Sequence, residues 1–507
     1  MKHTNNITSK VQTSLAFFES ELFNQVQMSG IFPDSKTFAD AIARFPIEDI
    51  LKKYNSAPIN NEKIIEFIAE NFIIPKLNEI LIETPSLDIN KQIDALWQAL
   101  RMPADQQLNS SLLALNKPYI VPGGRFREIY YWDSYFTALG LVESNQVALV
   151  ESMLENFVDL QSRYGLIPNG NRSYYISRSQ PPILGLLVEL LLPYQDDKGA
   201  FLKKYITPIE VEYQFWMQGS ASLSQGQYEH RRVVKMPDGS FLNRYWDDNE
   251  TPRSESYKED IELLHQSRPK NPDEFYRNIR AACESGWDFS SRWLADAQSL
   301  ASIRTTKIIP VDLNCLLYKQ ESLLADYYLA TGDKAASASY QNYALSRKNA
   351  INRYMWSTKQ GYFMDYDIGQ QNQSAVYSLA GVLPLFVQLA SSSQAEQIAD
   401  VIEDKFLQKG GLTTTAINSG QQWDAPNGWA PLHWFAVQGL LNYQQASLAQ
   451  TIKSRWLNTV EVYFNKTGKL MEKYNVCQQS DKAEGGEYDV QEGFGWTNGV
   501  YKAFVQK

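Results

Sequence analysis

The side chains of this sequence that could do chemistry are carboxylates, arginines and aromatics rather than metal ligands or activated nucleophiles. The histidines His3, His230, His265 and His433 are scattered, no His-x-x-x-His pair or Cys-x-x-Cys occurs, and a zinc site therefore has little support. The sequence also lacks Gly-x-x-x-x-Gly-Lys-Ser/Thr, a Gly-x-Gly-x-x-Gly after a strand pattern, and Gly-x-Ser-x-Gly. Phosphate, dinucleotide and serine hydrolase chemistry are disfavoured for the same reason.

Acidic, basic and aromatic residues gather in a few short stretches. These stretches are residues 122–135, 168–182, 252–256, 284–293, 422–431 and 493–498. Tryptophan and tyrosine beside Asp, Glu and Arg suit a carbohydrate, because a sugar has apolar ring faces rimmed by hydroxyl groups. Aromatics make up 13% of the chain, so many of them must also serve the core.

The stretches resemble the motifs of family 37 trehalases of the cytoplasmic bacterial type. Pro122-Gly-Gly-Arg-Phe-Arg-Glu128, continued by Tyr131-Trp-Asp-Ser-Tyr135, is similar to the first signature of that family, and Gln422-Trp-Asp-Ala-Pro-Asn-Gly-Trp-Ala-Pro431 to the second. Residues 22–27 and 32–38 resemble its N-terminal region, so the likeness runs nearly end to end. The resemblance implies an (α/α)6 barrel that hydrolyses α,α-trehalose to two glucose molecules with inversion, using no cofactor or metal.

The resemblance also implies which carboxyl groups act. Asp288, in Gly286-Trp-Asp-Phe289, matches the general acid, and Glu472, in Glu-Lys-Tyr, matches the general base. Cleaving an acetal with inversion needs a proton on the departing oxygen and a base that activates water on the opposite ring face, with the carboxyls roughly 6.5–9.5 Å apart. Because Asp288 must keep its proton at neutral pH, we expect burial or a neighbouring anion to raise its pKa.

Further residues match the sugar contacts of the family. They are Arg125, Trp132, Asp133, Asn169, Arg178, Ser179, Gln180, Arg253, Ser254, Glu255, Gly286 and Glu487. A guanidinium has five fixed donors and can hold two neighbouring hydroxyls in register. We expect Trp132 to stack on a sugar face and Asp133 to accept hydrogen bonds from hydroxyls.

Other carboxylates compete with Glu472 for the role of base. Glu484, Glu487 and Glu492 lie in the same part of the chain, and the sequence alone does not rank them. Two rival functions also stay open: a related glycosidase for another disaccharide, and a sugar-binding protein without activity. The second is disfavoured because both carboxyls are present. Trehalose 6-phosphate would need a separate phosphate clamp, and no motif for one is visible.

Two departures from the family pattern concern the base. Asn475 stands where the family often has Asp, and we expect it to alter the field around Glu472 slightly. The run Glu484-Gly-Gly-Glu487 is short, which predicts a less mobile segment over the sugar. The tryptophans Trp423, Trp429, Trp434 and Trp496 are expected to be scaffold or pocket wall, and His433 a hydrogen-bonded structural residue.

Helices must position these residues, because apolar side chains recur at helical spacing. Such patterns cover residues 147–158, 323–328 and 383–389, whereas alternating, strand-like stretches are short and few. The fold class we predict is all-α: an (α/α)6 toroid with long rim loops and an N-terminal helical extension. Residues 1–105 are expected to form this extension, packed on the barrel, and residues 106–507 the single catalytic barrel.

A weak internal repeat supports the toroid. Glycine is followed by an apolar residue two positions on and a polar residue four positions on in copies at residues 124–128, 165–169, 239–243, 361–365 and 468–472. Glycine suits a helix C-cap or tight turn, and alternate residues of an extended segment share a face. We therefore expect these glycines to end helices and several of the polar residues to meet in one cavity.

Composition limits partners and location. The net charge is −9 with no basic cluster, which argues against nucleic acid as a partner. No stretch approaches 18 apolar residues and residues 1–20 carry no apolar signal core, while the three cysteines are widely spaced, so neither a membrane span nor a disulfide framework is expected. These features favour a cytoplasmic protein, and we expect a monomer.

Overall fold

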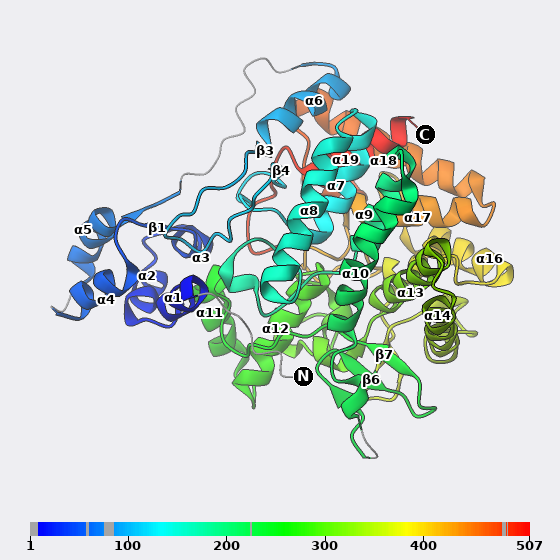
Figure 1. The fold of residues 1–507 in the computed structure, drawn as a ribbon, viewed down its shortest axis with the longest axis horizontal. Coiled ribbons are helices and arrows are strands. Elements are labelled where there is room, and N and C mark those ends of the chain that lie inside the picture. Colours follow the sequence, from blue (N-terminus) through cyan, green and yellow to red (C-terminus); the bar gives the residue numbers. More distant parts are fainter. Residues whose placement is uncertain are drawn as a thin grey trace.

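The computed structural model describes residues 9–56, 60–75, 86–223, 226–478, 483 and 485–506, and helices dominate it (Figure 1). Among the described residues, the inner helices of the ring are α7 (Tyr131–Glu143), α9 (Leu184–Leu191), α13 (Val311–Thr331), α15 (Leu383–Phe386), α17 (Ala430–Asn442) and α19 (Gly495–Gln506), and each is largely buried. Their outer partners are α6 (Ile89–Ala99), α8 (Val147–Tyr164), α10 (Lys198–Trp216), α14 (Lys334–Tyr354), α16 (Ser392–Val401) and α18 (Ala446–Thr467). Outer and inner helices alternate along the chain, as in the expected (α/α)6 toroid.

The first and last inner helices close the ring. Helices α7 and α19 pack together so tightly that a Cβ on Gly140 would lie 2.5 Å from the Cα of Gly499. A Cβ on Gly499 would lie 2.1 Å from the carbonyl oxygen of Phe136. Glycine at both positions therefore allows the backbones to touch, and the C-terminal helix completes the wall that begins at residue 131.

Two of the three predicted helices are present as expected, in α8 and α13, and the third is shorter. Helix α15 ends at Phe386, because Gln388 adopts a left-handed conformation with φ 56°. The amide of Leu389 then donates to the carbonyl of Pro384 in a turn. Leu389 is buried in the core, but it is not helical.

The strands are antiparallel, two or three residues long, and form small ribbons between helices. The ribbons are β1 (Ile42–Ala43) with β2 (Phe72–Ile73), β3 (Arg101–Met102) with β4 (Tyr119–Ile120), β5 (Glu229–His230) with β6 (Val233–Lys235) and β7 (Phe241–Asn243), β8 (Ile308–Ile309) with β11 (Tyr366–Asp367) and β12 (Asn372–Gln373), β9 (Trp356–Ser357) with β10 (Tyr362–Phe363), β13 (Leu407–Gln408) with β14 (Gly411–Leu412), and β15 (Asn427–Gly428) with β16 (Tyr474–Asn475). In the last ribbon Asn427 pairs with Asn475 and Gly428 with Tyr474.

The repeated glycines play two different roles. Gly165 and Gly468 are left-handed C-caps of α8 and α18, as expected. Gly239 and Gly361 instead lie in the turns of the β6–β7 and β9–β10 ribbons, and Gly124 lies in a turn before α7. The expectation that all five end helices is therefore wrong: the shared requirement is a positive φ, which both kinds of turn impose.

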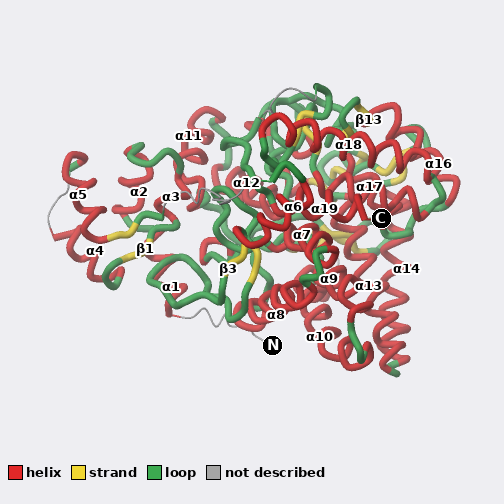
Figure 2. Tube along the Cα trace, turned by 90° about the horizontal axis from the view of Figure 1, so that it is seen from above, coloured by secondary structure: helices red, strands yellow, loops and turns green. Residues whose placement is uncertain are grey.

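The N-terminal helices form a second hydrophobic cluster at one end of the molecule (Figures 1 and 2). These helices are α1 (Ser9–Phe18), α2 (Glu21–Ser29), α3 (Ser35–Ala39), α4 (Ile47–Ser56) and α5 (Asn61–Asn71). Tyr130, Tyr174 and Tyr175 complete this cluster from the barrel side. Helix α6 belongs to the main core instead, and the boundary at residue 105 stays a prediction.

Two helices are inserted between α10 and α13, namely α11 (Tyr257–Ser267) and α12 (Pro272–Ser285). Helix α12 is almost wholly buried over its last two turns and ends in the left-handed Gly286. Among the described residues, no helix combines the length and the apolar composition needed to cross a membrane.

Candidate active site

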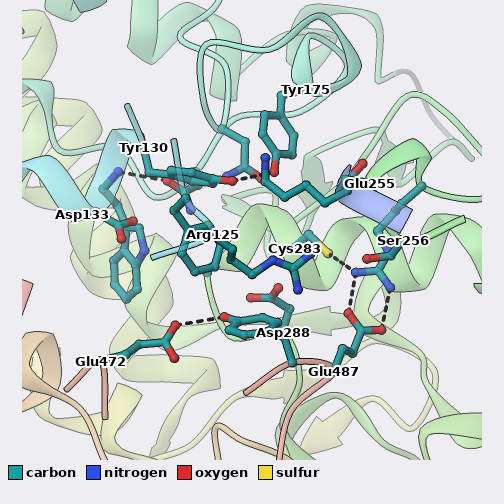
Figure 3. Close-up of a pocket in the computed structure, with 18 of the residues that line it drawn as sticks. Arg125, Tyr130, Asp133, Tyr175, Glu255, Ser256, Cys283, Asp288, Glu472 and Glu487 are labelled. Carbon is teal, nitrogen blue, oxygen red and sulfur yellow. Dashed lines mark hydrogen bonds and ion pairs between the residues drawn. The ribbon is translucent and has the colours of Figure 1, made fainter. Parts of the chain in front are cut away.

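A cavity at one end of the helix ring collects most of the predicted functional residues (Figure 3). Asp288 and Glu472 both line it. So do ten of the predicted sugar contacts, namely Arg125, Trp132, Asp133, Asn169, Arg178, Gln180, Arg253, Glu255, Gly286 and Glu487. Some of these residues follow α8, α12 and α18 or begin α7, and others lie in the loops before α7, α9, α11 and α19, so the helix ring brings distant parts of the chain together.

Ser179 and Ser254 do not line the cavity, unlike their sequence neighbours. The Ser179 hydroxyl donates to the carbonyl of Ile167 at 2.6 Å. The carbonyl of Ser254 accepts from the Gln27 amide at 3.2 Å. These serines hold loops in place, while Ser256 reaches the cavity wall.

Asp288 is positioned by the end of α12. Gly286 has φ 76°, and a Cβ there would lie 2.8 Å from the indole of Trp132. Glycine therefore lets the Trp132 ring pack directly against the turn that presents Asp288. Trp287 stacks on Trp423 with ring centroids 5.5 Å apart, which fixes the other side of the turn.

The segment after Asp288 is anchored to Asp424. The Ser290 hydroxyl donates to this carboxylate at 2.9 Å, and Ser291 donates through its amide at 2.7 Å and its hydroxyl at 2.8 Å. The amide of Trp423 donates to the carbonyl of Phe289 at 3.0 Å. The second tryptophan-rich motif thus serves to hold the segment that carries Asp288.

The electrostatic surroundings of Asp288 favour its protonated form. Burial raises its pKa to about 7, and the negative charge of Glu487 also raises it. The guanidiniums of Arg253 and Arg178 oppose this shift without cancelling it. The sequence-based expectation of a raised pKa agrees with this direction and cause.

Arg253 is saturated by protein partners. Its guanidinium donates to Asp260 at 2.6 Å and to Glu487 at 2.8 and 3.1 Å, and a further donor faces the thiol of Cys283 at 3.5 Å. The donors that were predicted to bind sugar hydroxyls are thus occupied by protein carboxylates in this structure. Its main effect in this structure is to hold Glu487 beside Asp288.

Arg178 organises a neighbouring part of the cavity wall. It donates to Asn169 at 3.0 Å, to Asp247 at 3.3 Å and to Glu255 at 2.7 Å, and it lies over the ring of Tyr175. Although burial raises the pKa of Glu255, the charges of Arg178, Arg253 and Arg280 together outweigh it and the net pKa is lowered. Glu255 is therefore an ionised acceptor on the cavity wall.

Arg125 is the least engaged of the three arginines. Its guanidinium lies over the Tyr488 ring, 4.7 Å from the centroid, and 4.0 Å from the carboxylate of Asp34. Its Nε has no hydrogen-bond partner among the described residues. Arg125 therefore has the most donors left for a ligand.

Glu472 follows α18 and precedes β16. The Tyr488 hydroxyl donates to its Oε1 at 2.9 Å, and the indole of Trp496 donates to its carbonyl at 2.8 Å. Its Oε2 accepts no hydrogen bond from the described residues. Burial raises the pKa of Glu472, and the opposing Lys473 ammonium and Tyr488 hydroxyl do not cancel this rise.

Asp133 adds a carboxyl in the first turn of α7. Burial raises its pKa well above the usual value, and the nearby charges of Glu472 and Asp288 raise it further. A protonated Asp133 can both donate to and accept from a hydroxyl group. This differs from the expected acceptor-only role.

Geometry separates the carboxylates that compete with Glu472. Glu492 forms a surface ion pair with Lys469 and does not line the cavity. Glu487 lines it, but both of its oxygens accept from Arg253. Glu484 lies outside the described residues. Of the described candidates that line the cavity, Glu472 alone has an oxygen that accepts no hydrogen bond from the described residues.

The other motif residues divide into wall and scaffold. Trp423, Trp429 and Trp496 line the cavity, whereas Trp434 packs against Phe504. His433 is structural, as expected: its Nε2 accepts from the Leu412 amide at 2.8 Å, and burial lowers its pKa to about 3.

Asn475 does not act on Glu472 directly. Its side-chain oxygen accepts from the amides of Cys477 and Gln478 at 3.0 and 2.9 Å, and so shapes the turn after β16. No contact among the described residues therefore supports the expectation that Asn475 alters the electrostatic field around Glu472.

The polar residues of the glycine repeat are all buried but do not all meet. Asn169 and Glu472 line the cavity. Glu128, Asn243 and Asp365 bind arginines behind it, respectively Arg172, Arg347 and Arg292. The repeat thus marks buried hydrogen-bonding positions around the ring.

Several cavity residues were not identified from the sequence. They are Lys36, Phe126, Tyr130, Tyr175, Ser256, Cys283, Tyr488 and Phe494. Phe126 packs edge-on against Tyr130, Tyr488 and Phe494, forming an aromatic wall. Lys36 comes from α3, and its ammonium pairs with Asp40 and Glu128 at 2.6 and 2.7 Å. Tyr488 could have been expected at the cavity because it follows Glu487 in the sequence, whereas no local sequence pattern places Lys36 there.

Comparison with known proteins identifies the family and the fold. The trehalase family model matches residues 22–507. Neutral trehalase Nth1 from Saccharomyces cerevisiae has a similar structure with TM-score 0.64 and 24% identity, covering 98% of this chain and 94% of that one. The GH63 mannosylglycerate hydrolase from Thermus thermophilus in complex with glucose matches with TM-score 0.56 and 16% identity, over 83% of this chain and 100% of that one. At these identities, the structural matches show a shared fold.

Proposed function

We propose that this chain, which belongs to the trehalase family, uses Asp288 as general acid and Glu472 as general base to hydrolyse α,α-trehalose with inversion. The activity itself, conversion of trehalose to two glucose molecules, follows from the family match over residues 22–507. The assignment of roles is supported by one observation above all. The same cavity holds a carboxyl whose pKa is raised to about 7 and a second carboxyl with an oxygen that accepts no hydrogen bond from the described residues.

Asp288 suits the acid role because it can deliver a proton near neutral pH. A carboxyl with a pKa of about 7 is protonated in a useful fraction of molecules and still acidic enough to protonate a departing glycosidic oxygen. The leaving glucose then departs as a neutral alcohol.

Glu472 suits the base role because its Oε2 is free to accept a proton from water. Tyr488 donates to the other oxygen, Oε1, and so fixes the orientation of the carboxylate. A water held by Oε2 attacks C1 from the side opposite the leaving sugar, which inverts that carbon.

The remaining cavity residues bind and orient the two sugar rings. Arg125 offers guanidinium donors, Asp133 and Glu255 offer carboxyl groups of different protonation, and Trp132 offers a flat ring face. Aromatic faces against the apolar side of a pyranose and charged groups against its hydroxyls are the usual division of labour in such a pocket.

The stereochemistry of the products tests the mechanism. One glucose receives its oxygen from water by inversion and emerges as the β-anomer, while the leaving glucose keeps its own C1–O bond and emerges as the α-anomer. Proton NMR of the anomeric signals in the first minutes, before mutarotation, should show the two in about equal amounts. An initial product that is all α would make Glu472 a nucleophile rather than a base.

Specificity is tested by glucose release from several disaccharides. Trehalose is expected to be cleaved far faster than maltose, and comparable rates would favour a glycosidase of broader linkage specificity. A cytoplasmic location is part of the proposal, supported by the three cysteines being free thiols. A monomeric state is also proposed. Light scattering of the purified chain measures the oligomeric state.

A further inference from the structure

A buried lysine lies directly behind the proposed base. Lys473 follows Glu472 in the chain, is 1% exposed, and is not among the residues that line the cavity. A buried ammonium is costly unless it is paired and hydrogen-bonded. Since Lys473 does not reach the sugar, any effect it has on the reaction must act through its neighbours.

The contacts of Lys473 leave its charge only partly compensated. Its ammonium donates to the side-chain oxygen of Gln422 at 2.6 Å and lies over the rings of Trp429 and Tyr488, 5.1 and 5.7 Å from their centroids. Its ion pair is with Glu472, at 3.7 Å from Oε2. This is the oxygen that accepts no hydrogen bond from the described residues.

Gln422 connects this lysine to the proposed acid. Its side-chain nitrogen donates to the carbonyl of Asp288, while its side-chain oxygen accepts from Lys473. The backbone carbonyl of Gln422 accepts from the Trp429 indole at 3.1 Å. With both ends of its amide occupied, Gln422 fixes the ammonium relative to the backbone that carries Asp288.

Gly486, which precedes Glu487, packs against the side chains of Gln422 and Lys473. A Cβ on Gly486, which has φ 105°, would lie 2.8 Å from the Gln422 side-chain oxygen and 3.4 Å from the Lys473 ammonium. Glycine lets the backbone close over these groups, and water is thereby kept from the ammonium. Because water is excluded, the attraction between the Lys473 ammonium and the Glu472 carboxylate is only weakly screened.

We propose that Lys473, held by Gln422, is a positioning residue that keeps Glu472 ionised and orients its free oxygen for attack through water. The inference rests on the proposed function, since it presupposes that Glu472 is the base. The motifs drew attention to Glu472 and to the tryptophans around Gln422, but they gave neither Lys473 nor Gln422 a role in the reaction.

The charges around Glu472 set the expected sign. Lys473 and Arg125 favour the carboxylate, as does the Tyr488 hydroxyl that donates to it, while Asp133 faces it as a further carboxyl. Lys473 is the larger of the two cationic influences. Without it the pKa of Glu472 rises, and Glu472 becomes protonated in the pH range where Asp288 still holds its proton.

The test is the pH dependence of kcat for Lys473→Met, with Lys473→Arg and Lys502→Met alongside. The acidic limb of the profile for Lys473→Met should move up by about 1–3 pH units, the usual effect of removing a close opposite charge. Lys473→Arg keeps the charge and should restore most of the limb. Lys502, a buried lysine of α19 that pairs with Asp94, controls for the loss of a buried ammonium elsewhere, and the profile of its variant should stay unchanged.

An acidic limb that stays in place in Lys473→Met overturns the inference, provided that Glu472→Gln abolishes turnover in the same series. Normal turnover in Glu472→Gln would instead overturn the assignment of the base itself. If Lys473→Met does not fold, Lys473→Gln carries the same measurement with a polar neutral side chain.

A double-mutant cycle tests the part played by Gln422. Gln422→Met should move the acidic limb in the same direction as Lys473→Met, and the double variant should show much less than the sum of the two shifts, because the two residues act as one unit. Additive shifts would mean that Gln422 does not act through Lys473.

Discussion

The two sides of the cavity hold their carboxyls in different ways. On the acid side, Asp288 lies on a segment tied down by Trp423 and Asp424, and a saturated Arg253 holds a second carboxylate, Glu487, close to it. On the base side, Glu472 is bound through one oxygen by Tyr488 and faces a buried lysine with the other. Burial raises the pKa on both sides.

The difference lies in the charge placed next to each carboxyl. Beside Asp288, the Arg253 guanidinium lowers the pKa but the Glu487 carboxylate offsets part of this effect, whereas beside Glu472 the Lys473 ammonium lowers the pKa. Two carboxyls in one dry cavity both tend to be neutral. The Glu487 anion on one side and the Lys473 cation on the other therefore help to separate the two pKa values.

Removal of either carboxyl should give the largest effect. Asp288→Asn and Glu472→Gln are each expected to lower kcat by at least ~10²–10⁴-fold, the usual scale for loss of a general acid or base. The near-isosteric amides should preserve the fold, which circular dichroism checks. If Glu487→Gln lost turnover while Glu472→Gln kept it, Glu487 rather than Glu472 would be the general base.

The arginines should separate binding from catalysis. Arg125→Lys, Arg178→Lys and Arg253→Lys are each expected to lower kcat/KM by roughly 10- to 150-fold, since a point charge cannot replace a planar fork. The loss should appear mainly in KM for Arg125, which has free donors, and mainly in kcat for Arg253, which holds Glu487 beside the acid. Arg353→Lys, at an exposed ion pair, is the control. Equal changes at all three positions would remove this distinction.

The titration of Asp288 should affect both the activity and the thermal stability of the protein. Activity is expected to fall as the pH rises through about 7, where Asp288 loses its proton. The folded-state pKa of Asp288 lies above the unfolded value near 4, so the stability it contributes is present at low pH and lost between about pH 4 and 7. Asp288→Asn should therefore gain in Tm relative to the parent as the pH rises from 4 to 8.

An exposed aspartate provides the opposite sign for comparison. Hydrogen bonds from the amides of Gln298 and Ser299 lower the pKa of Asp296. Its contribution is present at neutral pH and lost on acidification, so Asp296→Asn should be less stable than the parent at pH 7 and approach it at low pH. A Tm difference for Asp288→Asn that does not vary with pH would contradict the raised pKa.

Chelation should have the smallest effect. The described residues contain no group of three or more His, Cys, Asp or Glu arranged to hold a metal ion, and the proposed acid and base are both carboxyl groups. Activity is expected to be unchanged after incubation with EDTA, measured as glucose release. If EDTA abolished activity and added metal restored it, the reaction would require a metal ion in addition to the two carboxyls.

Local sequence patterns are enough to identify much of the site. The spacing of apolar residues predicted α8 and α13, and motif resemblance pointed to Asp288, Glu472 and ten of the other cavity residues. Such features are encoded locally, because helix periodicity and a short motif depend only on neighbouring residues. Where local pattern was ambiguous it failed: Leu389 follows helical spacing, but the left-handed Gln388 ends the helix before it.

The tertiary structure decided which groups stand next to those carboxyls. No spacing along the chain indicates that Lys36 of α3 reaches the cavity, that Arg253 spends its donors on Asp260 and Glu487, or that Gln422 joins Lys473 to Asp288. The sequence by itself determined the chemical groups and the helices that carry them. Their protonation and free donors depend on burial and on charges brought together from distant segments when the ring closes, and these are properties of the folded molecule alone.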